Sequence, residues 1–115
     1  ACASGADLEK VLMQLDKAGL RSYFKQVLSG HDCARNKPHP DVYLAAAHAL
    51  QADIQQCVVI EDRITGVTAG ASAGAEVWAY CPNNGHFSAE ELQQAGAKIC
   101  FSSMKEMVLL LNQHN

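Results

Sequence analysis

The sequence predicts an α/β fold of the Rossmann-like type, in which a largely parallel sheet is flanked by helices. Short apolar runs alternate with helical segments along the whole chain, and this alternation is typical of βα units with parallel strands. One run, residues 57–60, ends abruptly in two adjacent carboxylates, Glu61 and Asp62. With 115 residues, the chain has room for one domain or for part of one.

Strands are expected where a short apolar run is bounded by turn residues. Residues 57–60 have the β-branched content of a strand that is buried in a parallel sheet. The five expected strands are residues 1–3, 26–28, 57–60, 76–80 and 98–100.

Three helices are expected between the first four strands. The first carries an apolar stripe and ends before Gly19, which suits a helix C-terminus. The second, residues 41–50, follows two prolines, which are favoured at or just before a first helical turn. The third, residues 65–73, has glycines at a spacing of four, so that one helix face can approach the sheet closely. The stripe of the first helix is Leu8, Val11, Leu12 and Leu15, and the glycines are Gly66, Gly70 and Gly74.

Two further helices are expected to begin at capping boxes. In such a box, a serine and the acid three residues later satisfy each other's backbone N–H groups. The pairs are Ser88 with Glu91 and Ser103 with Glu106. We expect the final helix to be structural and to present one apolar face to the core, formed by Met104, Met107, Val108 and Leu111.

The composition indicates a soluble globular protein, with 49% hydrophobic and 18% charged residues. The net charge of −3, with scattered Lys and Arg, argues against a nucleic-acid groove. No apolar run approaches the roughly 20 residues that span a membrane. The cysteines are far apart and form no Cys-x-x-Cys motif, so we expect reduced thiols and a cytoplasmic location. They are Cys2, Cys33, Cys57, Cys81 and Cys100.

Three loops are expected to meet at the carboxyl edge of the sheet, where open α/β sheets bind their ligands. The first contains Ser4 and Gly5, between a strand and a helix. A hydroxyl and free backbone N–H groups at this place suit an anion. The alternative is an ordinary helix cap in which Ser4 or Asp7 satisfies the first turn.

The second loop contains Lys37, between an asparagine and a proline. These neighbours restrict the backbone, which suits a fixed positive charge directed at a phosphoryl group. The alternative is a solvated surface lysine.

The third loop contains Glu61 and Asp62. Carboxylates at the end of a buried strand are costly unless they are paired or bound to metal. Hard oxygen ligands of this kind suit Mg²⁺ with a phosphate-bearing substrate. Asp62 is the more direct candidate ligand, with Glu61 acting indirectly or through water. The alternative is a pair of acids that cap the next helix.

In this order, the motifs resemble the haloacid dehalogenase-like superfamily of phosphohydrolases, and most closely its β-phosphoglucomutase-like and sugar-phosphate phosphatase group. Ser4 matches the second family motif, Lys37 the third, and Glu61 with Asp62 the fourth. The segments 19–24, 37–43 and 66–70 with 73–74 also match the group, so the resemblance covers nearly the whole chain. No Gly-x-Gly-x-x-Gly follows a strand, which argues against a dinucleotide-binding domain.

The first family motif, Asp-x-Asp-Gly-Thr or a close variant, does not occur in the sequence. The resemblance implies that the nucleophilic aspartate, its acid/base neighbour and a helical cap would precede Ser4. The strand that carries the nucleophile would lie between the Ser4 strand and the Glu61 strand. We therefore expect residues 1–115 to be the C-terminal portion of a core domain, with two unpaired inner strand edges. Such edges favour self-association or a complementing N-terminal segment.

The resemblance implies a Mg²⁺-dependent phosphatase that acts on a small phosphorylated sugar through an aspartyl-phosphate. Mg²⁺ would bridge the missing aspartate, Asp62 and the phosphate. Lys37, Ser4 and the amide of Gly5 would contact the phosphoryl oxygens. A β-phosphoglucomutase-like phosphomutase and an inactive fragment or binding module remain as alternatives, and we expect residues 1–115 alone to be inactive. Arg63 stands where the family often has a small residue, and either reaches a substrate anion or is solvated.

Overall fold

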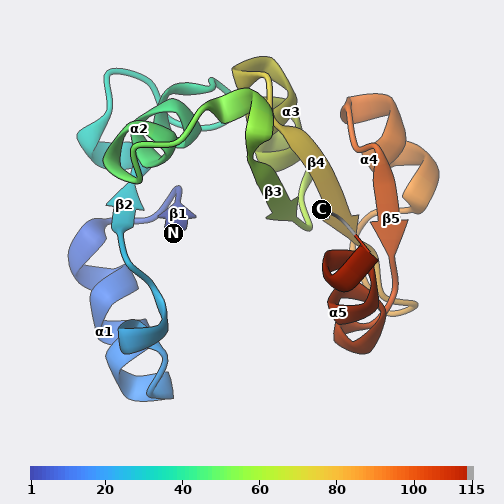
Figure 1. Ribbon diagram of the computed structural model, residues 1–115, viewed down its shortest axis with the longest axis horizontal. Helices are drawn as coiled ribbons and strands as arrows, with labels where there is room; N and C mark the ends of the chain where they lie inside the picture. The colour runs from blue at the N-terminus through green and yellow to red at the C-terminus, as the bar shows by residue number, and fades with distance from the viewer. Residues whose placement is uncertain (114–115) are drawn as a thin grey trace.

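The computed structural model describes residues 1–113 and has the alternating α/β order that the sequence predicts. Figure 1 shows the elements in chain order. The strands are β1 (Cys2–Ser4), β2 (Val27–Ser29), β3 (Val58–Glu61), β4 (Glu76–Tyr80) and β5 (Ile99–Phe101). The helices are α1 (Leu8–Ala18), α2 (Asp41–Ala49), α3 (Ile64–Ala73), α4 (Ala89–Ala95) and α5 (Met104–Gln113).

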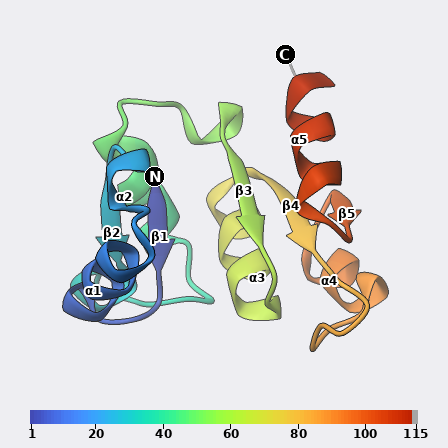
Figure 2. The same ribbon diagram turned by 90° about the horizontal axis from the view of Figure 1, so that it is seen from below.

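All of the strand pairs in the described residues are parallel, but they form two separate sheets. One sheet has the order β1-β2, and the other has the order β3-β4-β5. No ladder joins β1 to β3 within residues 1–113, as expected from the unpaired inner edges. Figure 2 shows the two groups of strands side by side, each with its own helices.

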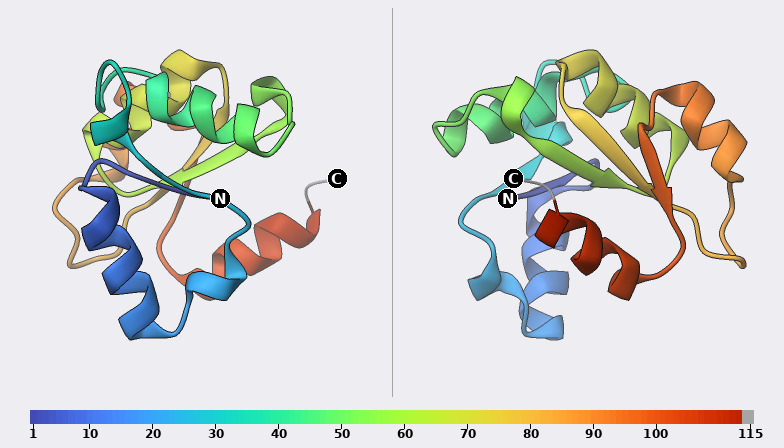
Figure 3. Two further views of the ribbon diagram at one scale, coloured as in Figure 1. Left: turned by 90° about the vertical axis from the view of Figure 1, so that its left-hand side faces the viewer. Right: turned by 45° about the vertical axis from the view of Figure 1, so that its right-hand side comes forward.

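Helices cover the strands from two sides. Figures 1 and 3 show α2, α3 and α4 on one side and α1 and α5 on the other. The core lies mainly under α3, where Val67, Val77 and Leu92 are fully buried or nearly so. Gly70 permits this packing, because a Cβ atom there would lie 2.9 Å from the side chain of Val77. The predicted close approach of the third helix to the sheet is therefore confirmed.

The ends of α1 and α4 confirm the cap predictions. Asp7 caps α1 by accepting a hydrogen bond from the backbone N–H of Glu9 at 3.0 Å. Gly19 ends this helix in the left-handed conformation, with φ of 71°. Ser88 and Glu91 form the complete capping box predicted for α4.

The prediction for the final helix is wrong in two respects. No residue of α5 is buried, and Met104, Val108 and Leu111 are 49%, 51% and 43% exposed. The apolar stripe is present, but only Met107 of its four side chains is partly buried, and β5 is the main element that α5 contacts. The capping box is also half formed, because the Glu106 carboxylate accepts from the N–H of Ser102 rather than that of Ser103.

The strand boundaries differ from the predicted ones by one residue in four strands, while β4 matches. A strand's ends depend on where its neighbour stops pairing, which periodicity does not show. None of the helices in residues 1–113 is long and apolar enough to cross a membrane.

Candidate active site

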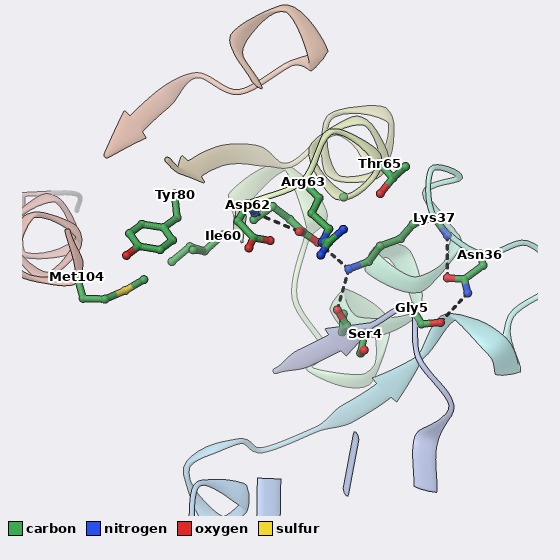
Figure 4. Close-up of a pocket in the computed structure, with 13 residues that line it drawn as sticks. Ser4, Gly5, Asn36, Lys37, Ile60, Asp62, Arg63, Thr65, Tyr80 and Met104 are labelled. Atoms are coloured by element: carbon green, nitrogen blue, oxygen red, sulfur yellow. Dashed lines mark hydrogen bonds and ion pairs between the residues drawn. The ribbon is translucent and has the colours of Figure 1, made fainter. Parts of the chain in front are cut away.

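A cavity of about 650 Å³ lies at the carboxyl ends of β1 and β3. The structure brings all of the sequence-predicted site residues together in its lining, and Figure 4 shows their arrangement. They are Ser4, Gly5, Lys37, Glu61 and Asp62.

The loop after β1 is held in shape by local hydrogen bonds. The hydroxyl of Ser4 accepts from the backbone N–H of Ala6 at 3.1 Å. The hydroxyl of Ser29 donates to the carbonyl of Ala6 at 2.5 Å. Because Asp7 caps α1, Ser4 is not needed as the helix cap. Ser4 therefore lines the cavity wall without serving as the cap of α1.

Asn36 joins this loop to the lysine loop, and sequence reasoning did not identify it as a site residue. Its side-chain amide donates to the carbonyl of Gly5 at 2.8 Å, and its oxygen accepts from the N–H of Lys37 at 2.8 Å. Gly30 provides the space, because a Cβ atom there would lie 1.8 Å from the Asn36 oxygen. The only signal in the sequence was the position of Asn36 directly before the lysine.

Lys37 is not a solvated surface lysine. Its ammonium group donates to Glu61 Oε2 at 2.6 Å and to the carbonyl of Ala3 at 3.0 Å. The side chains of Lys37 and Glu61 are only 15% and 11% exposed. One fixed cation therefore connects the ends of the two separate sheets.

Glu61 is engaged on both carboxylate oxygens. Oε2 accepts from Lys37 and from the hydroxyl of Tyr43, and Oε1 accepts from the N–H of Asp62 at 3.3 Å. Burial, followed by the charge of Glu61, raises the pKa of Tyr43 far above its usual value, so the hydroxyl remains a donor. Gly66 leaves room for this carboxylate, because a Cβ atom there would lie 2.1 Å from its Cδ.

Asp62 supplies the carboxylate of the cavity lining that no other described side chain binds. It is exposed, and its side chain forms no hydrogen bond or ion pair within residues 1–113. The two acids do not cap α3, since Arg63 occupies the cap position without a side-chain bond. The helix-cap alternative is therefore wrong for this pair.

The carboxylates of the cavity fit Mg²⁺ only if other groups complete its coordination. Mg²⁺ is usually bound through one or two carboxylates, with water and substrate phosphate completing the octahedron. Asp62 supplies one such carboxylate directly, whereas Glu61 would have to leave Lys37 and Tyr43 to become a second ligand. No group of three His, Cys, Asp or Glu side chains that could hold a metal occurs in the described residues. The other ligands would therefore come from water, phosphate or backbone carbonyls.

The topology and this site define a parallel α/β protein with an acid–lysine cluster at its carboxyl edge. The chain belongs to the haloacid dehalogenase-like hydrolases, because the model of that family matches residues 1–74. Within the family, it resembles two phosphatases and a β-phosphoglucomutase-like protein.

Two relatives from Escherichia coli K12 are phosphatases. The chain is 33% identical to 6-phosphogluconate phosphatase over 78 residues, which are 65% of this chain and 35% of that protein. It is 41% identical to hexitol phosphatase B over 66 residues, which are 57% of this chain and 28% of that protein.

Two solved structures share the fold. A haloacid dehalogenase family hydrolase from Deinococcus radiodurans R1, with bound phosphate and sodium, aligns over 99% of this chain with a TM-score of 0.89 and 31% identity. A β-phosphoglucomutase-like protein from Thermotoga maritima aligns over 96% with a TM-score of 0.87 and 27% identity. The chain spans about half the length of these proteins, 52% and 50%.

Proposed function

We propose that these 115 residues form the C-terminal part of the core of a Mg²⁺-dependent phosphatase that acts on a small sugar phosphate. One observation carries the proposal. A hydroxyl loop, a buried lysine and an available carboxylate line a single cavity at the carboxyl edge of parallel strands. The sugar-phosphate phosphatases among the relatives support the substrate class.

Different residues of the chain would have different roles in binding a phosphate group. Ser4 and the amide of Gly5 would hydrogen-bond its oxygens, and the ammonium group of Lys37 would offset its charge. Asp62 would hold Mg²⁺, which when bound supplies Lewis-acid stabilisation of the phosphoryl oxygens. Glu61 would orient Lys37 rather than bind the metal, because its carboxylate already accepts hydrogen bonds from Lys37 and Tyr43.

The nucleophile would come from a segment outside these residues. The chain has no Asp-x-Asp-Gly pattern, and Asp62 is the only aspartate that lines the cavity. A second cavity, of about 590 Å³, lies between β1, α2 and β3 and is lined mostly by apolar side chains such as Ala46, Val58 and Val59. We propose that one extended segment fills it, pairs with the facing edges of β1 and β3, and brings its aspartate to the edge where Lys37 lies.

That aspartate would attack the phosphorus atom, so that an aspartyl-phosphate forms and the P–O bond to the sugar breaks. The sugar would leave as an alcohol after taking a proton from the acid/base aspartate of the same segment, and water would then hydrolyse the acyl-phosphate to free phosphate. A phosphomutase would use the same groups, and the similarity to a β-phosphoglucomutase-like protein keeps it as the second candidate. We also propose a cytoplasmic location, because each of the five cysteines is a free thiol and none forms a disulfide.

Melting curves of the 115-residue chain with Mg²⁺, with inorganic phosphate and with both test the proposal. A phosphatase half-site predicts that both together raise the melting temperature more than the sum of either alone. No effect of either would favour an inactive binding module or structural remnant. The purified chain should release no phosphate from sugar phosphates, and robust Mg²⁺-dependent release would contradict the proposed position of the nucleophile. Its measured molecular mass would show whether the open strand edges cause self-association.

A further inference from the structure

Arg63 is a charged side chain of the cavity that the proposed phosphate site does not use. It lines the cavity directly after Asp62, at the cap position of α3. Its backbone is extended, with φ of −124° and ψ of 149°. Figure 4 shows the side chain reaching into the cavity, towards the end of Lys37.

The charge of Arg63 has no local partner. Lys37, the other cationic side chain that lines the cavity within the described residues, is paired with Glu61 at 2.6 Å. The guanidinium of Arg63 forms no ion pair or hydrogen bond within residues 1–113, including with its neighbour Asp62. By contrast, Arg21 and Arg35 are surface arginines that each pair with an aspartate.

We propose that Arg63 binds a second anionic group of the substrate, a carboxylate or a second phosphate, in addition to the phosphate that reacts. The planar guanidinium matches either group with two parallel N–H donors. A cavity of about 650 Å³ holds a molecule of six carbons with both groups. This inference rests on the proposed phosphatase function and names its substrate class: a phosphorylated sugar acid or a sugar bisphosphate.

Lys37 and Arg63 play different parts in this assignment. Lys37 is largely buried and is fixed by Glu61 and Ala3, so we assign it to the group that is common to all substrates. Arg63 is exposed and lies at the start of α3, so we assign it to a group that differs between substrates. Its removal should change the preference between substrates and leave the binding of phosphate intact.

Two open-chain, six-carbon probes test the inference: gluconate 6-phosphate and glucitol 6-phosphate. They differ only in a terminal carboxylate against a hydroxymethyl group. Isothermal titration of the 115-residue chain with Mg²⁺ should give a Kd for gluconate 6-phosphate about 10-fold lower than for glucitol 6-phosphate. Arg63→Gln should bring the ratio close to 1 and leave the Kd for glucitol 6-phosphate within about 2-fold.

Arg21→Gln is the matched control, because it makes the same change in net charge at an arginine that pairs with Asp16 outside this cavity. It should keep the wild-type ratio. The side chain of Arg63 forms no hydrogen bond or ion pair within residues 1–113, so the urea midpoint of Arg63→Gln should equal that of wild type.

The possible failures are distinct. If wild type binds neither probe, the proposed function fails and the inference fails with it. If wild type binds both probes equally, or if Arg63→Gln weakens both alike, the proposed function stands and the assignment of Arg63 to a second anion is overturned.

Discussion

Replacing Lys37 with methionine should destabilise the fold far more than an ordinary surface substitution. The ion pair with Glu61 is 2.6 Å long, and its two side chains are 15% and 11% exposed. Removing one partner of a buried pair costs about 3–5 kcal/mol, because the other charge is left without compensation. Tyr43 still donates to Glu61, so the lower end, about 3 kcal/mol, is expected.

The double variant separates the ion pair from the loss of lysine packing. Lys37→Met with Glu61→Gln removes both charges, so it should be more stable than Lys37→Met alone by about 1–2 kcal/mol. A double variant that is more stable than Lys37→Met indicates a coupled pair, because the destabilising effects of two independent substitutions would add.

Urea unfolding followed by tryptophan fluorescence measures these changes. Trp78 is the only tryptophan and is 1% exposed, so its emission reports on the core. With an m-value of about 1.5 kcal/mol/M, a loss of 3 kcal/mol lowers the midpoint by about 2 M. Arg21→Met is the control, since its pair with Asp16 is 52% and 56% exposed and should contribute under about 1 kcal/mol. Equal midpoints for Lys37→Met and Arg21→Met, or a double variant less stable than Lys37→Met, would refute the buried pair.

Three further predictions concern the same region and the thiols. Gly66→Ala should cost about 1–3 kcal/mol in the urea assay, because its Cβ would displace the carboxylate of Glu61; unchanged stability would mean that Glu61 lies elsewhere. Asp62→Asn should leave stability without Mg²⁺ within about 0.5 kcal/mol of wild type and abolish the stabilisation by Mg²⁺, and a surviving Mg²⁺ effect would exclude Asp62 as the ligand. Burial, and then the neighbouring Cys81, raise the pKa of Cys100 above its ordinary value of 9.0. Above about pH 9, Cys100 ionises in the unfolded chain before it ionises in the folded chain, so the free energy of unfolding should fall as the pH rises. Cys100→Ser should lessen this fall, and an equal fall in the variant would contradict the raised pKa. Mass spectrometry should find iodoacetamide labelling of Cys100 half-maximal at a higher pH than that of free cysteine, and labelling at the ordinary pH would also count against it.

The sequence predicted the fold because its signals were local. Caps such as Asp7 and Ser88 and the glycine spacing of α3 depend on residues a few positions apart. The apolar stripe of α5 was also a local signal, but the sequence does not show which element covers a stripe. The structure shows Val108 half exposed.

The site was predicted in its composition and not in its internal contacts. Glu61 and Asp62 were predicted from their position after a strand, and Lys37 from its place between an asparagine and a proline. The bonds that hold them join residues far apart in the chain: Asn36 bonds to Gly5, and Tyr43 bonds to Glu61. Such pairs arise from the docking of one loop on another, which a single sequence does not reveal.

The cavity between the ends of β1 and β3 should bind phosphate and Mg²⁺ together. Titration of the ¹⁵N-labelled chain with inorganic phosphate, with and without Mg²⁺, tests this claim directly by NMR. The amide signals of Ser4, Gly5 and Lys37 should shift with phosphate, that of Asp62 should shift with Mg²⁺, and each ligand should tighten the binding of the other. Shifts confined to residues outside this cavity, or no shifts at either ligand's saturating concentration, would contradict the claim.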